Sequence, residues 1–474
     1  MFTSISKEHI IRRIQGDNPW WATGSIEDEF KAMPERLYLD QMFPILEDIN
    51  LRRAVVLMGP RRVGKSVMIR HAIQKLLNNG VYGRKIFYLS IDTPIYTGIS
   101  LETLFEYCQE AVHDFSNEGF YMLYDEVQSL KGWEVDLKSL VDRFRKCKFL
   151  ASGSAAAALK MKSNESGAGR FTDFMLPPLT FYEYLVLQNI DKLIYRTVKI
   201  PFTTNDIESL NIHFIDYINF GGYPEMVFNR NIRENPERFI KNDILDKSLL
   251  RDLPGLYGIS DVQELYRLFA TVAYNSGNEF SLEGLSETSQ ILKSTIKKYL
   301  EYLEAAYLIK LHYRVDMSGK KFKRANFFKI YLTNPSMRSA LFSPIQSDSE
   351  DTGNLVETAL ISQNTLPKNG RTFYARWDKG EVDLVTLSAL LKPTGALEIK
   401  WSDRYSNRLN ELKSLLSYAK ANNLTSVFVT SKTFEGEKEV EGIKIQFVPS
   451  ALYVYYVGYV CFHNHTDAWS SPIQ

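Results

Sequence analysis

The fold of this chain is decided by the stretch Gly59-Pro60-Arg61-Arg62-Val63-Gly64-Lys65-Ser66. It follows a short apolar run, Ala54 to Met58, and a helical pattern begins directly after it, at Val67. The spacing G-x-x-x-x-G-K-[ST] is satisfied at every specified position, and a preceding strand with a following helix is the context that this spacing requires. The stretch therefore predicts a phosphate-binding loop between a strand and a helix.

The residue types of this loop suit the phosphates of ATP. Glycines let the backbone N–H groups turn toward the phosphates, and the helix N-terminus adds a partial positive charge. Lys65 is expected to reach the terminal phosphates, and Ser66 is expected to coordinate Mg²⁺. The residues predicted to contact ATP are Gly59, Pro60, Arg61, Arg62, Val63, Gly64, Lys65, Ser66, Val67 and, from a later strand end, Ser152.

An acidic residue at the end of a neighbouring strand should complete the site, and the run from Phe120 to Glu126 supplies it. Asp125 would hold Mg²⁺ through water, and Glu126 would orient or deprotonate the attacking water, because phosphoryl transfer relies mainly on positioning and charge stabilisation. A strand that ends in Asp-Glu is often only a solvated strand end. Together with the loop, it predicts ATP hydrolysis.

Two further residues are candidates with open alternatives. The strand end Ser152-Gly153-Ser154 could place a hydroxyl near the γ-phosphate, and a simple turn of small residues fits the same pattern equally well. Arg170 could neutralise charge on the phosphates as an arginine finger or sensor. An ordinary surface arginine fits its spacing as well.

The predicted elements indicate an α/β fold with several domains. Strand patterns at residues 85–91, 119–124 and 148–151 alternate with helical stretches, which is typical of a parallel sheet covered on both faces. A chain of 474 residues exceeds the size of one core. We expect a P-loop domain at 1–195, a helical lid at 196–275, a winged helix at 276–345 and, after an acidic linker at 346–353, an α/β domain at 346–474.

Composition excludes several classes of protein. The formal charge of +1 gives no overall attraction to nucleic acid or to an anionic membrane, so any such binding must come from local patches. Three widely spaced cysteines fit neither a disulfide framework nor a four-ligand zinc site. The N-terminus lacks an apolar signal region, and the apolar stretch Ala451 to Cys461 is too short to span a bilayer. We expect a cytoplasmic protein without a membrane partner.

Within the predicted winged helix, apolar residues between Leu282 and Leu303 fit two packed helices, with Ser294 as the N-cap of the second. Lys297 and Lys298 would lie on the outer face of that helix, and the basic run 320–324 would form the wing. Such cations can bind DNA phosphates without sequence preference. Winged helices also serve as protein-interaction modules, and that alternative stays open.

Four residues near the C-terminus predict a second site. Glu357 lies on a helical stretch, Asp383 on a strand, and Glu398 and Lys400 on one face of the next strand. Two or three of these carboxylates would hold Mg²⁺ or Mn²⁺, while Lys400 stabilises a hydroxide that attacks a phosphodiester. The set resembles the PD-(D/E)xK nuclease superfamily. The resemblance implies a DNA endonuclease, or a nuclease-like domain that keeps the acidic face only for binding or structure.

Several motifs in order carry a wider resemblance: the phosphate loop, Leu123-Tyr124-Asp125-Glu126-Val127-Gln128, Ser152-Gly153-Ser154, Ala168-Gly169-Arg170, Leu176-Pro177-Pro178-Leu179-Thr180-Phe181-Tyr182-Glu183-Tyr184 and Gly221-Gly222-Tyr223-Pro224-Glu225. Together they resemble the prokaryotic AAA-type (AAA_14-like) ATPases whose C-terminal half carries the domain of unknown function DUF4143. The resemblance covers nearly the whole chain. It implies an AAA+ core, raises Ser152 and Arg170 as site residues, and makes a homo-oligomeric ring or dimer an expected assembly.

The sequence thus predicts an ATP-driven protein that processes DNA, with branched or single-stranded DNA as candidate substrates. In this interpretation, ATP hydrolysis at the AAA+ core controls the winged helix and the nuclease-like domain. A regulatory NTPase switch that binds a protein partner is the main alternative. A regulator that binds DNA without cleaving it is a third.

Overall fold

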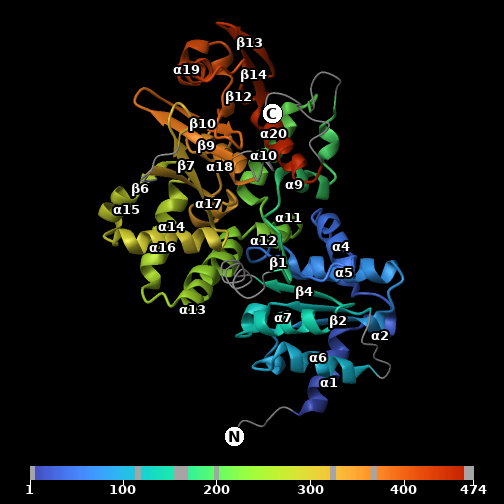
Figure 1. Ribbon diagram of the computed structural model, residues 1–474. Coiled ribbons are helices and arrows are strands. Elements are labelled where there is room, and N and C mark those ends of the chain that lie inside the picture. Colours follow the sequence, from blue (N-terminus) through green and yellow to red (C-terminus); the bar gives the residue numbers. More distant parts are fainter. Residues whose placement is uncertain are drawn as a thin grey trace. The chain divides into compact units, whose positions relative to one another are not determined.

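The computed structural model describes residues 6–112, 119–153, 169–196, 202–320, 327–363 and 371–463. The chain forms two compact parts, here called the N-terminal unit (residues 1–177) and the C-terminal unit (residues 178–474). Each unit is built around its own sheet (Figure 1). The lid, winged helix and α/β domain expected after residue 195 all fall within the C-terminal unit.

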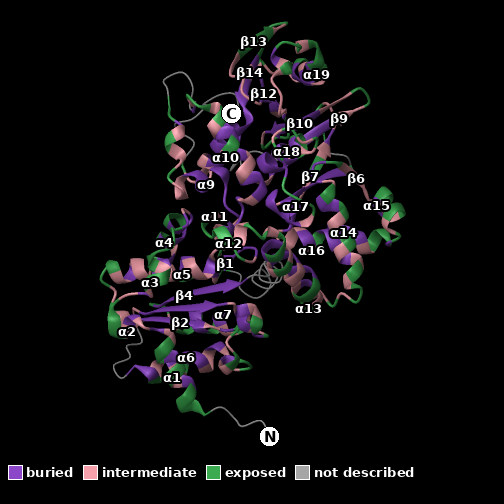
Figure 2. Ribbon diagram, turned by 180° about the vertical axis from the view of Figure 1, so that it is seen from behind, coloured by how far each residue is buried: buried purple, intermediate pink, exposed green. Residues whose placement is uncertain are grey.

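The N-terminal unit contains a parallel five-stranded sheet in the order β2-β3-β4-β1-β5. Its strands are β1 (Ala54–Met58), β2 (Ile86–Ser90), β3 (Tyr121–Asp125), β4 (Lys148–Gly153) and β5 (Phe171–Met175). Every residue of β1, β3 and β4 is buried, as strands covered on both faces require (Figure 2). The predicted parallel α/β sheet is confirmed, although the sequence did not predict β5.

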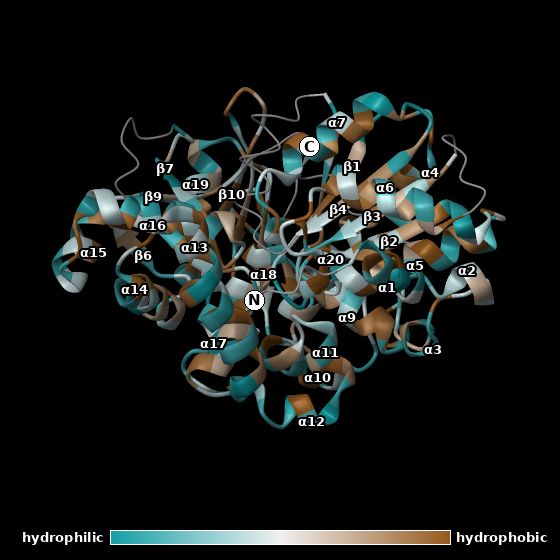
Figure 3. Ribbon diagram, turned by 90° about the horizontal axis from the view of Figure 1, so that it is seen from below, coloured by the Kyte–Doolittle hydropathy of each residue, from teal (hydrophilic) through white to brown (hydrophobic). Residues whose placement is uncertain are grey.

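Helices cover both faces of this sheet, with α4 and α5 on one side and α6 and α7 on the other (Figure 1). The helices are α1 (Lys7–Asp17), α2 (Trp20–Thr23), α3 (Asp28–Lys31), α4 (Leu39–Glu47), α5 (Lys65–Asn78), α6 (Leu101–Ala111) and α7 (Trp133–Arg143). In α5, buried residues recur at the spacing of one helix face, from Met68 to Leu76. In Figure 3 the helices of this unit, α5 among them, show both hydrophobic and hydrophilic residues, as amphipathic helices do.

The C-terminal unit contains a mixed nine-stranded sheet in the order β13-β14-β12-β11-β10-β9-β7-β8-β6. Its strands are β6 (Glu279–Ser281), β7 (Ile309–Val315), β8 (Phe327–Leu332), β9 (Arg371–Trp377), β10 (Gly380–Leu387), β11 (Pro393–Glu398), β12 (Ser426–Ser431), β13 (Gly436–Val440) and β14 (Ile443–Pro449). β7 pairs in parallel with β9. The boundary expected between residues 345 and 346 therefore lies inside a unit whose strands form one continuous sheet.

Along the chain, the helices of the C-terminal unit come before, between and after the strands of this sheet. They are α9 (Phe181–Leu187), α10 (Ile207–Phe220), α11 (Pro224–Phe228), α12 (Arg230–Arg233), α13 (Leu253–Tyr257), α14 (Val262–Tyr274), α15 (Leu282–Ser289), α16 (Lys293–Ala305), α17 (Ser336–Leu341), α18 (Thr352–Gln363), α19 (Lys413–Ala421) and α20 (Ser450–Val460). Two π-helical segments, Glu237–Asp246 and Ser248–Asp252, were not predicted. None of the helices in the described ranges is long and apolar enough to cross a membrane.

Candidate active site

The phosphate loop connects β1 to α5 as the sequence predicted. α5 begins at Lys65, and Gly64 before it has a left-handed backbone with φ of 95°. The first turn of α5 contains no acidic residue, so no carboxylate there neutralises the positive end of the helix. A Cβ on Gly59 would lie 2.3 Å from the carbonyl oxygen of Leu176, so only glycine lets the loop approach the end of β5 this closely.

Lys65 is buried, and its ammonium points into the loop. The Nζ atom donates to the carbonyl oxygens of Gly59, at 3.1 Å, and of Pro60, at 2.8 Å. Arg36 supports the loop from outside, because its guanidinium donates to the Val63 carbonyl oxygen and, at 2.9 Å, to that of Pro177. Sequence reasoning missed Arg36, since it belongs to no motif and lies well before the loop in the chain.

Asp125 lies at the carboxyl end of β3, where two hydroxyl groups fix its carboxylate. The Ser152 hydroxyl donates to Oδ1, and the Tyr88 hydroxyl donates to Oδ2 at 3.0 Å. β4 lies between β1 and β3, so the acidic strand is one strand further from the loop than expected, and Ser152 comes from the strand in between. Ser154 lies outside the described residues. Tyr88 was missed because a tyrosine in a buried strand reads as core.

Glu126 follows Asp125 with a left-handed backbone, φ 55° and ψ 41°, which is rare for glutamate and concentrates at functional sites. Its backbone N–H donates to Asp125 Oδ1 at 3.1 Å, and Gln128 Nε2 donates to its carboxylate. Burial raises the pKa of Glu126, and Lys65 opposes that rise. A carboxylate with a raised pKa is better suited to accept a proton from water.

Ser66 and Asp125 fit the Mg²⁺ ion that a nucleotide would bring. Mg²⁺ prefers oxygen ligands and keeps several of its waters, so one hydroxyl and one carboxylate suffice beside the phosphates. Asp125 is buried and oriented by hydrogen bonds, and Ser66 lies in the first turn of α5. These two residues would hold the ion.

Arg170 does not join this site. Its carbonyl oxygen accepts from the Ala54 N–H, which places it at the start of β1, whereas the phosphate loop follows the end of that strand. The two ends are about 15 Å apart, since a strand rises about 3.3 Å per residue. The Arg170 guanidinium pairs instead with Asp142 at 2.6 Å. Of the two possibilities left open for Arg170, action in its own chain or in another copy, this placement disfavours the first.

The C-terminal carboxylates do come together. β10 and β11 pair antiparallel with Leu384 opposite Leu397, so Asp383 and Glu398 are next to one another across the pair. Lys400 Nζ lies 2.8 Å from Glu398 Oε1 and 3.4 Å from Asp383 Oδ2. Lys329 of β8 lies 3.0 Å from Glu357 Oε1.

In this arrangement the carboxylates are paired with lysines. No three His, Cys, Asp or Glu side chains within the described parts of the chain are placed so that they could hold a metal ion. Lysine ammonium groups contact these carboxylates instead, and metal binding by Glu357, Asp383 and Glu398 stays a prediction.

In the region expected to be a winged helix, α15 and α16 are followed by the antiparallel pair β7 and β8, and β6 also pairs with β8. Lys297 and Lys298 are exposed on α16, as predicted. α16 begins at Lys293, with Leu292 as its N-cap, so Ser294 lies inside the first turn and is not the N-cap. Lys320 is exposed, and the rest of the basic run, 321–324, lies outside the described residues.

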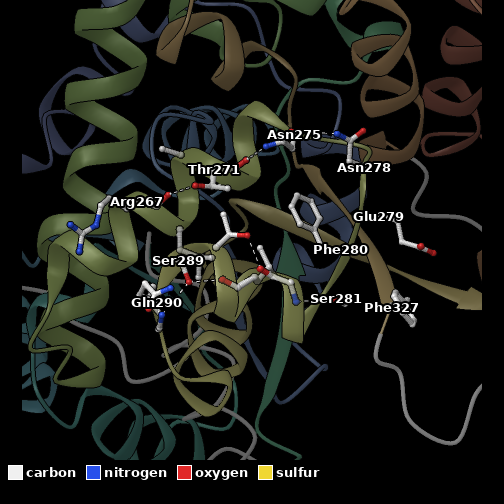
Figure 4. A pocket seen from close by; sticks show the side chains of 16 residues that line it. Arg267, Thr271, Asn275, Asn278, Glu279, Phe280, Ser281, Ser289, Gln290 and Phe327 are labelled. Atoms are coloured by element: carbon white, nitrogen blue, oxygen red, sulfur yellow. Dashed lines mark hydrogen bonds between the residues drawn. The ribbon is translucent and has the colours of Figure 1, made fainter.

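A cavity of about 990 Å³ lies beside these helices, between α14, β6 and α15 (Figure 4). Its lining combines hydroxyl and amide side chains, such as Thr271, Asn278 and Gln290, with the aromatic ring of Phe327 and the guanidinium of Arg267. No sequence pattern pointed to this cavity, because its walls come from separate elements. Hydrogen-bonding groups beside apolar ones suit a polar ligand or a peptide.

Comparison with known families identifies two domains. Residues 51–185 match the family AAA_14, described as "AAA domain", and residues 211–349 match the "Domain of unknown function (DUF8612)". DUF8612 thus occupies much of the half in which the sequence resemblance implied DUF4143.

Similar proteins include two whose names state no function. An uncharacterized protein of Haemophilus influenzae is 25% identical over 426 residues, which cover 88% of this chain and 98% of that protein. The uncharacterized protein MJ1637 of Methanocaldococcus jannaschii is 23% identical over 369 residues, covering 72% of this chain and 74% of that protein.

Two solved structures also resemble the chain. The Walker-type ATPase paby2304 of Pyrococcus abyssi has a TM-score of 0.39 and 15% identity, covering 66% of this chain and 99% of that one. The ORC2 protein of Aeropyrum pernix has a TM-score of 0.40 and 13% identity, covering 65% and 94%.

The phosphate loop, the acidic strand end and the parallel sheet agree with the family match to residues 51–185. The N-terminal part of the chain is therefore a P-loop ATPase domain of the AAA class, and the domain DUF8612, of unknown function, follows it.

Proposed function

We propose that this protein is a Mg²⁺-dependent ATPase whose nucleotide state controls the binding of DNA by the C-terminal unit. One observation carries the ATPase part. The end of β1, Asp125 and Ser152 lie at the same edge of the parallel sheet, which supports the proposal that the phosphate loop and the acidic pair act on one ligand.

Each group of residues has its own role in phosphoryl transfer. Backbone N–H groups of the loop and of the first turn of α5 bind the phosphates, and Lys65 reaches the terminal one. Ser66 and Asp125 would hold Mg²⁺, which neutralises phosphate charge when bound. Glu126 positions the attacking water and accepts its proton, and its raised pKa suits that step.

The DNA part rests on the exposed face of α16. Lys297 and Lys298 are solvent-exposed there, and no ion pair to either is formed within the described residues. Unpaired lysines on one helix face attract phosphates and release counterions on binding. Cleavage of DNA is not part of the proposal, because lysines already bind the carboxylates that would have to act.

The cavity beside α15 favours a second candidate, a regulatory ATPase that binds a protein partner. A bound peptide could form hydrogen bonds with the polar side chains of the cavity and pack against the exposed ring of Phe327. This candidate predicts slow ATP turnover that DNA does not change.

Steady-state ATP hydrolysis with single-stranded, duplex and four-way-junction DNA distinguishes the two, with Lys65→Ala as the blank. The proposal predicts that at least one DNA form changes the rate and binds less tightly to the double variant Lys297→Ala/Lys298→Ala. A matched control is Lys392→Ala/Lys413→Ala, which removes two exposed lysines elsewhere in the same unit that also form no ion pair within the described residues. Equal DNA affinity of both double variants and a DNA-independent rate would favour the protein-binding candidate.

A further inference from the structure

The C-terminal unit contains a compact group of charges, here called the carboxylate cluster. Its members come from four elements: Glu357 from α18, Glu381 and Asp383 from β10, Glu398 at the end of β11, Lys329 from β8, and Lys400 just after β11. Asp383 and Lys329 are almost fully buried. Because charges are costly to bury unless they are paired, the contacts within the cluster determine what it can bind.

Lys329 lies at the centre of these contacts. Its Nζ atom is 2.8 Å from Glu381 Oε1, 3.0 Å from Glu357 Oε1 and 3.6 Å from Asp383 Oδ1. Only 6% of the side chain is exposed. Tyr331, two residues further along β8, donates its hydroxyl to the same Glu357 oxygen at 2.5 Å. One ammonium thus joins three carboxylates that a divalent cation would otherwise draw together.

Lys400 engages the other side of the cluster. It pairs with Glu398 Oε1 at 2.8 Å and with Asp383 Oδ2 at 3.4 Å, and the Ile399 N–H donates to that same Asp383 oxygen. Both oxygens of Asp383 are therefore already bound by cations or donors. The second oxygen of Glu398 is buried and has no hydrogen-bond partner in the described structure.

The Lys329 ammonium lies at the position among these three carboxylates that a divalent ion would need. Mg²⁺ requires oxygen ligands at about 2.0–2.1 Å in near-octahedral geometry, whereas the carboxylates here are spaced around an ammonium at 2.8–3.6 Å. A second cation among the same oxygens would also be repelled by Lys329 and Lys400 at close range.

We propose that the Lys329 ammonium takes the place of a divalent metal ion among Glu357, Glu381 and Asp383. The cluster consequently binds no metal in the native chain and instead ties β8 to α18 and β10. Removing the ammonium leaves several carboxylates, including the free oxygen of Glu398, around a space that a hydrated divalent cation would fill.

The test compares Mn²⁺ binding without nucleotide in variants made on a Ser66→Ala/Asp125→Asn background, which lacks the two residues that would hold a metal ion at the phosphate loop. Lys329→Ala is expected to bind Mn²⁺ in titration calorimetry and to gain at least about 2 °C in Tm with Mn²⁺ relative to EDTA. The background protein is expected to show neither effect. Adding Asp383→Asn to Lys329→Ala should abolish both effects.

Lys148→Ala is the matched control, because Lys148 is a buried lysine whose ammonium caps the carbonyl oxygens of Asp48 and Leu51. It should lose stability without gaining a response to Mn²⁺. A folded Lys329→Ala that ignores Mn²⁺ would overturn the proposal. Mn²⁺ binding by the background protein that disappears with Asp383→Asn would also overturn it, and this second comparison decides the matter even where Lys329→Ala does not fold.

Discussion

At the scale of single residues, the site depends on groups that hold the acidic pair in place. Tyr88 is nearly buried, its hydroxyl donates to Asp125, and the Arg70 guanidinium lies 3.8 Å above its ring. Burial and the Asp125 charge raise the pKa of Tyr88, so the hydroxyl remains a donor.

Tyr88→Phe should therefore lower kcat about 10- to 150-fold, because a hydrogen bond to a charged group contributes roughly 1.5–3 kcal/mol. The expected effect appears as a larger Mg²⁺ requirement with little change in the affinity for nucleotide, since Tyr88 orients Asp125 and does not contact the loop. Steady-state kinetics at varied Mg²⁺ check this. A loss of nucleotide affinity equal to the loss of kcat would contradict a positioning role.

Glu126 gives a pH dependence with a defined sign. Burial raises the pKa of the Glu126 carboxylate. An exposed glutamate has a pKa of about 4.3, so Glu126 becomes protonated at a higher pH than an exposed glutamate does. As pH falls, kcat should decline with a midpoint above that value, and raising the pH should restore it. The pH–rate profile measures this midpoint. A rate that stays constant down to the ordinary range would contradict Glu126 as the base.

At the scale of elements, strands and loops were predictable where a short continuous stretch of sequence carries the whole pattern. The phosphate loop, β2, β3 and β4 followed from apolar runs that end in glycine or acidic residues. β5, Arg36 and Tyr88 could not be predicted, because their importance arises only from pairing and packing with distant segments. Lys329 had no signal either: it is a lone cation in an apolar strand, and its carboxylate partners are far away in sequence.

α20 shows how an apolar run that is too short for a membrane becomes core. Leu452 is almost fully buried there, among apolar residues of α9, α10 and α18. Leu452→Ala should destabilise the C-terminal unit by about 2–5 kcal/mol. Lys444→Ala, an exposed control on β14, should stay within about 0.5 kcal/mol of wild type. Urea unfolding measures both, and equal stability of the two variants would show that α20 is not part of the core.

At the scale of the whole molecule, the chain forms two compact units, and the last three of the four domains expected from length and pattern fall within the second. The sequence-based boundary between residues 345 and 346 was drawn at an acidic, apolar-poor segment. The β7–β9 pairing and the Lys329–Glu357 ion pair cross it, and neither contact has a local signature in the sequence.

Fragments test this division. A fragment of residues 178–474 should unfold cooperatively, because it retains its entire sheet. A fragment of residues 346–474 should not, since β9 loses its partner β7 and the carboxylates lose Lys329. Circular dichroism during urea unfolding compares them. A cooperative transition in the shorter fragment would show that residues 346–474 fold as a domain of their own.

The central claim is that Asp125 and Glu126 act with the phosphate loop in ATP hydrolysis. Its most direct test is to measure ATP binding and single-turnover hydrolysis in wild type and in Glu126→Gln, with Lys65→Ala as the blank. The account predicts that Glu126→Gln binds ATP as tightly as wild type and hydrolyses it about 10²–10⁴-fold more slowly. Hydrolysis at the wild-type rate in Glu126→Gln would contradict it.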